Sequence, residues 1–269
     1  MELALIITGS VIAALLVIYL ILIAPGKRGN IKEFTTVSYA HRGLHGEGIA
    51  ENSISAFRAA VEAGYGIELD VRLSKDGKLV VFHDDTLDRV CGVCGRVDAF
   101  TAEELANMRL SGTEDGVPLF DDVLSLVDGK VPLLVEIKED AGKYGVSTAA
   151  AERLATYGGR FIVESFNPLS LMNMKKRLPT ALRGVLSQQF TRDKNYRKPL
   201  YFALQLLLLN RLASPAFVAY NHEHAGALSL RLFRALFRGA TFAWTTRSPE
   251  DHAKASKAFS ACIFEYYLP

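Results

Sequence analysis

The sequence predicts an α/β fold, a TIM (β/α)8 barrel preceded by a single N-terminal transmembrane helix. Short runs rich in Val, Ile and Leu alternate with amphipathic segments along the 269-residue chain, which is typical of a parallel sheet covered by helices. Eight strands of this kind indicate a closed barrel, and the chain is long enough because such barrels need roughly 250 residues. An uncharged apolar run over residues 3–24 supplies the transmembrane helix.

The composition divides the chain into three parts. Residues 1–25 are the expected transmembrane anchor, 26–36 a short polar linker, and 37–269 the barrel, with an apolar insertion near 188–212. We favour an anchor over a cleaved signal peptide. A signal peptide has a positive amino end, a shorter apolar core and a small-residue cleavage site, whereas here the first charge is Glu2 and the long apolar run ends only at Pro25.

The charges beside the anchor predict its orientation. Lys27, Arg28 and Lys32 follow the apolar run, whereas the amino end offers only Glu2 and the terminal amine. The positive-inside rule therefore predicts a single-pass membrane protein whose carboxy-terminal domain is cytoplasmic.

The expected strands are short apolar runs of the kind that form buried strands. Residues 75–78 form a turn, and a further strand over 79–83 pairs back on the second strand as a hairpin. The other strands are expected at 37–41, 67–73, 132–138, 161–166, 182–187, 217–221, 242–246 and 261–266.

The expected helices lie between these strands. The helix over 52–63 is amphipathic and stops at Gly64, and the helix over 101–108 begins with a capping box formed by Thr101 and Glu104. Segment 201–212 is almost wholly apolar. It is either an unusually apolar barrel helix, which is our default, or a surface helix that enters the bilayer beside the anchor. Further helices are expected at 120–127, 147–157, 168–177, 229–238 and 249–259.

Charge and cysteine content exclude some classes of function. The chain has 31 Lys and Arg against 29 Asp and Glu, all scattered, so we expect no nucleic-acid partner. Cys91 and Cys94 form a lone CxxC motif with no second pair and no nearby histidines to complete a zinc site. We interpret this segment as a glycine-rich loop with two free thiols.

Three acids are expected to meet at neighbouring strand ends. Glu68 and Asp70 are two residues apart on one strand, so their side chains leave the same face. Glu136 lies near the end of the next main strand. Carboxylate oxygens alone suit Mg²⁺ or Ca²⁺ better than zinc. The alternative is that these acids are neutralised only by ion pairs with Arg42, Arg72 and Lys138.

Two histidines and an arginine accompany these acids. His41 and His83 each end an apolar strand, and a pair of imidazoles can divide the acid and base steps of a reaction. The planar guanidinium of Arg42 is suited to bind a phosphate. A metal, an arginine and two histidines together indicate phosphoryl chemistry. His222 and His224 are interpreted as polar loop residues rather than as a second metal site.

The order of these motifs resembles a known family. HRG (41–43), EN (51–52), ExDV (68–71), VVFHD (80–84) and EIK (136–138) make the chain similar to the glycerophosphodiester phosphodiesterase family, in a membrane-anchored bacterial-type form. The resemblance implies a barrel, a divalent cation held by Glu68, Asp70 and Glu136, and acid–base work by His41 and His83. It further implies phosphate contacts from Arg42 and Lys138, the pair Glu51 and Asn52 at the edge of the site, and Trp244 in the substrate cleft.

The implied reaction is the metal-dependent hydrolysis of a glycerophosphodiester to an alcohol and glycerol 3-phosphate. A lysophospholipase D-type enzyme, which would use the same site on a membrane lipid, is the nearest alternative, and the anchor and the apolar insertion favour it. The expected partners are a small-molecule or lipid phosphodiester and a membrane, contacted through the N-terminal helix and, if segment 201–212 is a surface helix, through that segment as well.

Overall fold

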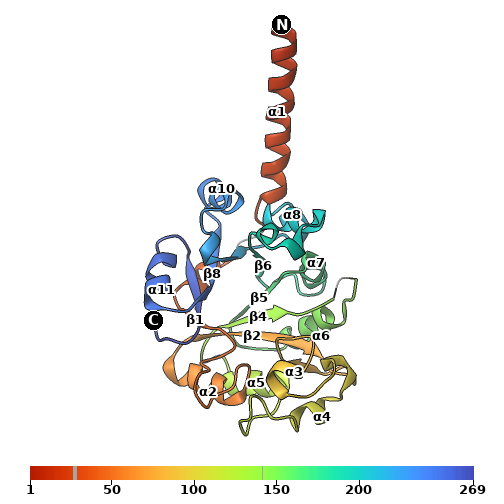
Figure 1. The fold of residues 1–269 in the computed structure, drawn as a ribbon, viewed down its shortest axis with the longest axis vertical. Coiled ribbons are helices and arrows are strands. Elements are labelled where there is room, and N and C mark those ends of the chain that lie inside the picture. Colours follow the sequence, from red (N-terminus) through yellow and green to blue (C-terminus); the bar gives the residue numbers. More distant parts are fainter. Residues whose placement is uncertain (27–28, 141) are drawn as a thin grey trace.

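The predicted (β/α)8 barrel is confirmed. The computed structural model describes residues 1–26, 29–140 and 142–269, so Lys27 and Arg28, on which the topology prediction partly rests, lie outside the described residues. One sheet has the strand order β1-β9-β8-β7-β6-β5-β4-β2-β3, and a pairing of β1 with β2 closes it (Figure 1). Its parallel strands are β1 (Tyr39–Ala40), β2 (Gly66–Leu73), β4 (Leu133–Ile137), β5 (Phe161–Ser165), β6 (Arg183–Ser187), β7 (Phe217–Asn221), β8 (Ala240–Thr246) and β9 (Ala261–Phe264).

All helices except α1 lie around this barrel. Most begin and end within a few residues of the predicted ranges, and the capping box of Thr101 and Glu104 is present. The α-helices are α1 (Glu2–Ile23), α2 (Ile54–Ala63), α3 (Asp88–Cys91), α4 (Ala102–Ala106), α5 (Phe120–Val127), α6 (Gly145–Leu154), α7 (Pro168–Arg177), α8 (Pro199–Gln205), α9 (Asn210–Ala213), α10 (Leu228–Phe237) and α11 (Pro249–Ala255). The short 3-10 helices are η1 (Ile31–Thr35), η2 (Val97–Ala99), η3 (Phe190–Arg192), η4 (Lys194–Tyr196) and η5 (His222–His224).

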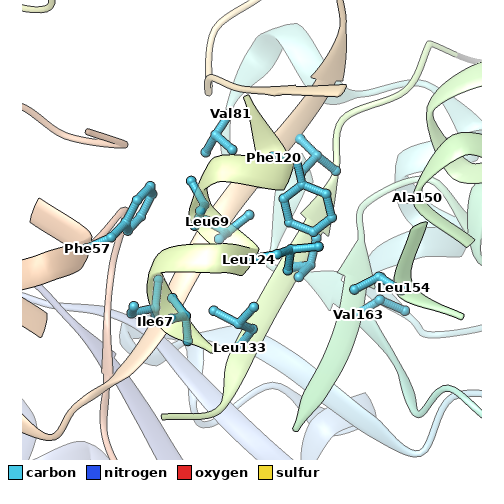
Figure 2. Packing of buried hydrophobic residues seen from close by; sticks show 14 of the residues in the cluster. Phe57, Ile67, Leu69, Val81, Phe120, Leu124, Leu133, Ala150, Leu154 and Val163 are labelled. Atoms are coloured by element: carbon cyan, nitrogen blue, oxygen red, sulfur yellow. The ribbon is translucent and has the colours of Figure 1, made fainter. Parts of the chain in front are cut away.

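Strand β2 separates a hydrophobic face from an acidic one. Ile67 and Leu69 pack outward against Phe57 of α2 and Phe120 of α5, in a fully buried cluster (Figure 2). Because successive side chains on a strand point to opposite faces, the intervening acids Glu68 and Asp70 point into the barrel. The core that covers the outside of the sheet therefore fixes the direction of the charged side chains.

The hairpin strand β3 (Leu79–Val81) is antiparallel to β2 and ends two residues earlier than expected. Beyond it, the backbone N–H of Phe82 donates to the carbonyl of Asp70 at 2.9 Å. The side chain of Arg72 donates to the carbonyl of His83 at 2.7 Å. These bonds hold His83 beside the acids even though it lies outside the strand.

The opposite, amino-terminal end of the barrel is closed by the segment that was expected to be a polar linker. Within η1, Ile31 and Phe34 are buried in one cluster with Phe217 and Phe242. The hydroxyl of Tyr39 donates to the carbonyl of Phe34 at 3.0 Å. Part of residues 26–36 therefore belongs to the barrel core, because its apolar side chains cover the end that the site does not use.

The predicted helix over 201–212 is wrong, since two short helices, α8 and α9, occupy this segment. Leu207 between them has a φ of 60°. Two serine hydroxyl groups donate hydrogen bonds to the backbone carbonyls at the end of α8. Ser187 of β6 donates to the carbonyl of Leu204 at 3.0 Å, and Ser229 of α10 donates to that of Gln205 at 2.8 Å. The carbonyl of Leu204 also accepts a bond from the backbone N–H of Leu207 at 3.0 Å, so α8 ends in a tight turn that these hydroxyl groups bond to the barrel.

Helix α1 stands away from the barrel (Figure 1) and meets it only at its carboxy end. There Ile23 is fully buried, and the side-chain amide of Asn210 in α9 donates to its carbonyl at 3.0 Å. Among the described residues, α1 is one helix whose length and apolar composition would allow it to cross a membrane. A signal sequence near the amino terminus has the same properties.

Candidate active site

Four buried acids lie inside the barrel near the carboxyl ends of its strands. Asp70, Glu136 and Glu164 occupy one level, because β2, β4 and β5 pair Asp70 with Glu136 and Glu136 with Glu164. Glu68 lies at the preceding inward position of β2. Oxygen atoms of Glu68, Asp70 and Glu136 all lie within 4.8 Å of one another. The strand register thus brings the three predicted metal ligands together, and it adds Glu164 beside them.

Burial raises the free energy of the ionised form of these carboxyl groups, and their pKa values change accordingly. Burial, together with the neighbouring carboxylates, raises the pKa of Glu68 and of Glu164 well above the ordinary value. Burial and Asp70 raise the pKa of Glu136 to about 7, although Lys138 opposes them. Asp70 behaves differently: burial would raise its pKa, but Lys138, His83 and Arg42 together hold it well below the ordinary value.

Only two cations within bonding distance balance these acids in the described part of the chain. The ammonium of Lys138 lies 2.8 Å from Glu136 and 3.2 Å from Asp70, and the Nε atom of Arg42 lies 3.6 Å from Asp70. Arg72, the third cation suggested by the sequence, instead pairs with Asp85 at 2.6 Å. Ion pairing therefore accounts for part of the acidic group but not for all of it.

The donor set fits a hard divalent cation. The converging atoms are all carboxylate oxygens, the ligands that Mg²⁺ and Ca²⁺ prefer. One buried oxygen of the adjacent Glu164 has no hydrogen-bond partner among the described residues, and unpaired buried charge is costly. A cation between Glu68, Asp70 and Glu136 would relieve both the repulsion and the burial penalty.

His41 is oriented by an acid from the far end of the chain. Its Nδ1 atom lies 2.6 Å from Glu265, and its Nε2 atom lies 4.0 Å from Glu68. Because a carboxylate only accepts hydrogen bonds, Nδ1 carries the proton, and Nε2 faces the acids. Burial lowers the pKa of His41, with Glu265 partly opposing the shift. Glu265 is also bonded to Arg247 at 2.5 Å.

His83 has an equivalent acidic partner in Asp84. Its Nδ1 atom lies 2.6 Å from this carboxylate, which also accepts a bond from Arg89 at 2.6 Å. Burial would raise the pKa of Asp84, but bonds from Arg89 and His83 lower it to about 2. Burial lowers the pKa of His83, although Asp70 opposes this. The carboxylate of Asp84, the last residue of the VVFHD motif, therefore orients His83.

The HRG and EN motifs are bonded to the acids and to each other. The backbone N–H of Arg42 donates to Glu68 at 2.9 Å, and its guanidinium donates to Glu51 at 2.7 Å. The side-chain amide of Asn52 donates to Asp70 at 2.9 Å. Arg42 and Asn52 both have positive φ values, 55° and 54°, a strained conformation that costs about 1–3 kcal/mol for such residues. The two motifs thus fix the acids from one side.

A small pocket of about 160 Å³ joins these groups. Glu51, Asn52 and Asp70 are not among the residues that line it, and Asn52 and Asp70 are almost fully buried. The predicted site residues that line the pocket are His41, Arg42, Glu68, His83, Glu136, Lys138 and Trp244, and the wall also contains Glu164, Phe166 and Arg247.

Sequence reasoning missed Glu164, Glu265 and the role of Asp84. The signal that identified Glu136, an acid at the end of a buried apolar run, is also present in FIVES at Glu164 and in ACIFE at Glu265. Applied to every strand, this rule finds both acids. It does not assign Glu265 to His41, because that contact depends on barrel closure.

Comparisons with known proteins identify the family of the chain. The model of the glycerophosphoryl diester phosphodiesterase family matches residues 41–265. The chain is 38% identical over 165 residues to a glycerophosphodiester phosphodiesterase of Caldanaerobacter subterraneus, a match that covers 57% of this chain and 67% of the relative. It is 35% identical over 164 residues to one from Bacillus altitudinis, covering 56% of this chain and 66% of that protein.

Solved structures share the fold. An Oleispira antarctica phosphodiesterase in complex with the product sn-glycerol-3-phosphate matches with a TM-score of 0.72 and 21% identity, covering 86% of this chain and 94% of the other. A Thermotoga maritima glycerophosphodiester phosphodiesterase matches with a TM-score of 0.66 and 27% identity, covering 85% and 93%. The chain belongs to the glycerophosphoryl diester phosphodiesterase family and is a phosphoric diester hydrolase.

Proposed function

We propose that the enzyme hydrolyses glycerophosphodiesters to an alcohol and glycerol 3-phosphate with a divalent cation, Mg²⁺ or Ca²⁺, held by Glu68, Asp70 and Glu136. The observation that carries this proposal is the convergence of three carboxylates within 4.8 Å of one another, two of which, Glu68 and Glu136, line a pocket that also contains His41 and His83. The Oleispira antarctica protein, a structural neighbour, holds sn-glycerol-3-phosphate as its product, which supports the same product class here.

Different residues of the pocket would bind the phosphate and transfer protons. Arg42 and Lys138 would bind the nonbridging phosphate oxygens, where negative charge is concentrated. When bound, the cation would supply further positive charge to the same oxygens. One imidazole would accept a proton from the attacking water as its oxygen bonds to phosphorus, and the other would donate a proton to the leaving alcohol as the phosphorus–oxygen bond breaks. Glu265 and Asp84 would hold the two rings with Nε2 available for these transfers.

The remaining predicted residues would support this arrangement. Glu51 holds Arg42, and Asn52 holds Asp70, so we assign both to positioning rather than to contact with the substrate. Trp244 borders the pocket beside Phe166, with ring centroids 5.6 Å apart, and would contact the organic part of the diester.

A direct test measures release of glycerol 3-phosphate from glycerophosphocholine with EDTA and after addition of Mg²⁺ or Ca²⁺. Activity should disappear with EDTA and return with the cation, and His41→Ala and His83→Ala should each lower turnover by roughly 10²–10⁴. His222→Ala, outside the pocket, is the matched control. Full activity in EDTA would contradict the proposed metal dependence, and full activity in both histidine variants would contradict the proposed roles.

We further propose that α1 is a single-pass anchor and that the barrel is cytoplasmic. The apolar length of α1 and the basic residues that follow it support this orientation. Protease treatment of intact cells and of spheroplasts tests it: protection of the barrel in both is expected, and digestion from outside would reverse the topology.

A lysophospholipase D-type activity is the second candidate function. It is favoured by Leu200, Phe202 and Leu212 of α8 and α9, which are 46–54% exposed near the carboxy end of α1. Apolar side chains at this position would contact the bilayer surface. Comparing turnover of a lysophospholipid with that of glycerophosphocholine separates the two candidates.

A further inference from the structure

A second, larger cavity lies beside the catalytic pocket. It has a volume of about 510 Å³, within the range of about 300–1,000 Å³ that is usual for small-ligand sites. Its floor is formed by Glu139, Phe166 and Gln188, which follow the carboxyl ends of β4, β5 and β6. Its roof is the α8–α9 segment, through Leu204 and Leu209. The cavity therefore opens on the same end of the barrel as the catalytic acids.

A row of aromatic rings connects the two cavities. Phe166 belongs to the walls of both. Its ring packs edge-on against Trp244 of the catalytic pocket, with centroids 5.6 Å apart, and against Phe190 at 6.1 Å. Phe190 in turn lies 5.5 Å from Tyr201. A ligand group leaving the catalytic pocket past Phe166 would meet a continuous apolar surface.

The outer end of the cavity lies beside helix α1. Leu200 and Leu212 line the cavity and are also about half exposed, so they mark its mouth. The roof is bonded to α1, since Tyr19 donates to the carbonyl of Leu206 at 3.4 Å and Asn210 donates to that of Ile23 at 3.0 Å. The mouth therefore lies near the end of the helix that we propose to be the membrane anchor.

We propose that this cavity binds the single acyl or alkyl chain of a monoacyl glycerophosphodiester whose phosphate lies in the catalytic pocket. The apolar wall runs from Phe166, at the catalytic pocket, to Leu200 and Leu212 at the mouth, which suits an extended hydrocarbon chain. The reaction is the proposed one: water adds to phosphorus, the bond to the headgroup alcohol breaks, and the alcohol leaves protonated. Monoacylglycerol phosphate is the other product.

The lining chemistry favours a hydrocarbon over a polar headgroup. The carboxylate and amide side chains of the lining lie on its floor, at the carboxyl ends of the strands. They are Glu139, Asn167 and Gln188. Towards the mouth, the walls are leucine and aromatic side chains. The hydroxyl groups of Tyr196 and Tyr201 offer few hydrogen-bond partners for a charged or hydroxylated headgroup that loses its hydration there, whereas an acyl chain gains from leaving water.

This inference rests on the proposed function, and the first experiment separates the two. The full chain in lipid nanodiscs is given glycerophosphocholine and a series of 1-acyl-glycerophosphocholines of increasing chain length, each supplied as a monomer. We expect kcat/KM to rise by at least about tenfold with chain length and then to level off, because each buried methylene adds to binding until the cavity is full. A flat series with normal glycerophosphocholine turnover overturns the acyl site alone, and absence of turnover on every diester overturns both proposals.

A matched pair of variants then tests whether the acyl chain of the substrate lies in this cavity. Leu209 lines the cavity, whereas Leu206, three residues earlier, does not and is exposed. Leu209→Trp should fill the cavity and lower kcat/KM for the long-chain substrate by about tenfold. The kcat/KM for glycerophosphocholine should stay within about twofold of the wild-type value. Leu206→Trp should change neither. Equal behaviour of the two variants on the long-chain substrate would overturn the site, and if Leu209→Trp loses all activity, the wild-type chain-length series decides.

Discussion

His41 donates a hydrogen bond from Nδ1 to Glu265 across 2.6 Å, although 224 residues separate the two in the chain. The contact exists because β9 pairs with β1 in parallel, with Phe264 beside Ala40. The residues that follow each strand therefore meet at the carboxyl end of the barrel. Glu265 thereby fixes the tautomer of His41 and aims Nε2 at the acidic group.

Replacing Glu265 by glutamine should lower kcat by roughly 10²–10⁴ with little change in KM, because a misoriented imidazole transfers protons poorly. The carboxylate raises the pKa of His41 against the effect of burial. Its loss should therefore move the limb of the pH–rate profile that His41 governs to lower pH. The matched control is Glu250→Gln, at an exposed position of α11. An unchanged pH profile would contradict the positioning role.

Glu164 should behave differently from Glu136 although the two are paired across neighbouring strands. Burial and the neighbouring carboxylates raise the pKa of Glu164 well above its ordinary value, and Glu164 is not part of the group of Glu68, Asp70 and Glu136 whose oxygens lie within 4.8 Å of one another. We therefore expect Glu164 to lie beside the cation rather than to bind it. Glu164→Gln should keep cation affinity within about threefold, whereas Glu136→Gln should weaken it beyond the roughly 10–100-fold effect of outer residues. Calorimetric cation titration measures both. A large loss in Glu164→Gln would make Glu164 a ligand.

Cation binding should stabilise the enzyme more at about pH 8 than at about pH 5. Burial raises the pKa of Glu136 to about 7, above that of about 4.3 in an unfolded chain. Between these values the folded, metal-free state binds more protons than the unfolded state. Its free energy of unfolding therefore falls as pH rises through this window.

Thermal unfolding in EDTA and in Mg²⁺ or Ca²⁺ measures this difference. In EDTA, Tm should fall as pH rises from about 4.3 to about 7. Adding the cation should restore Tm, because the bound cation neutralises the carboxylates in place of the proton. Glu136→Gln is the control, because it removes one of the groups whose pKa is raised and should make this part of the profile shallower. A cation effect on Tm that is equal at both pH values would contradict the prediction.

Shortening α1 should separate membrane attachment from stability. Deleting residues 2–18 should release the enzyme from the membrane fraction and leave glycerophosphocholine turnover within about twofold, because the catalytic pocket contains no residue of α1. Deleting residues 2–24 also removes Ile23, which is fully buried, and should cost a further ~1.5–3 kcal/mol in free energy of unfolding. Centrifugation and denaturant unfolding measure the two effects. Retention of the shorter chain on membranes would show that α1 is not the sole attachment.

Local patterns in the sequence determined most of the framework. Apolar runs placed the strands, and two-residue spacing placed Glu68 and Asp70 on one face. The acid at the end of a strand identified Glu136. These predictions succeed because alternation and burial depend on neighbouring residues of one strand. The same rule, had it been applied to every strand, would have added Glu164 and Glu265.

Only the tertiary structure decided which partners meet. The bond between His41 and Glu265 depends on closure of the barrel, and the alignment of Glu136 with Glu164 depends on the register of two strands. The break between α8 and α9 coincides with carbonyls bonded to Ser187 and Ser229 of the barrel. Each of these contacts joins residues distant in the chain. Their energies arise only after the sheet has closed, so no local pattern in the sequence records them.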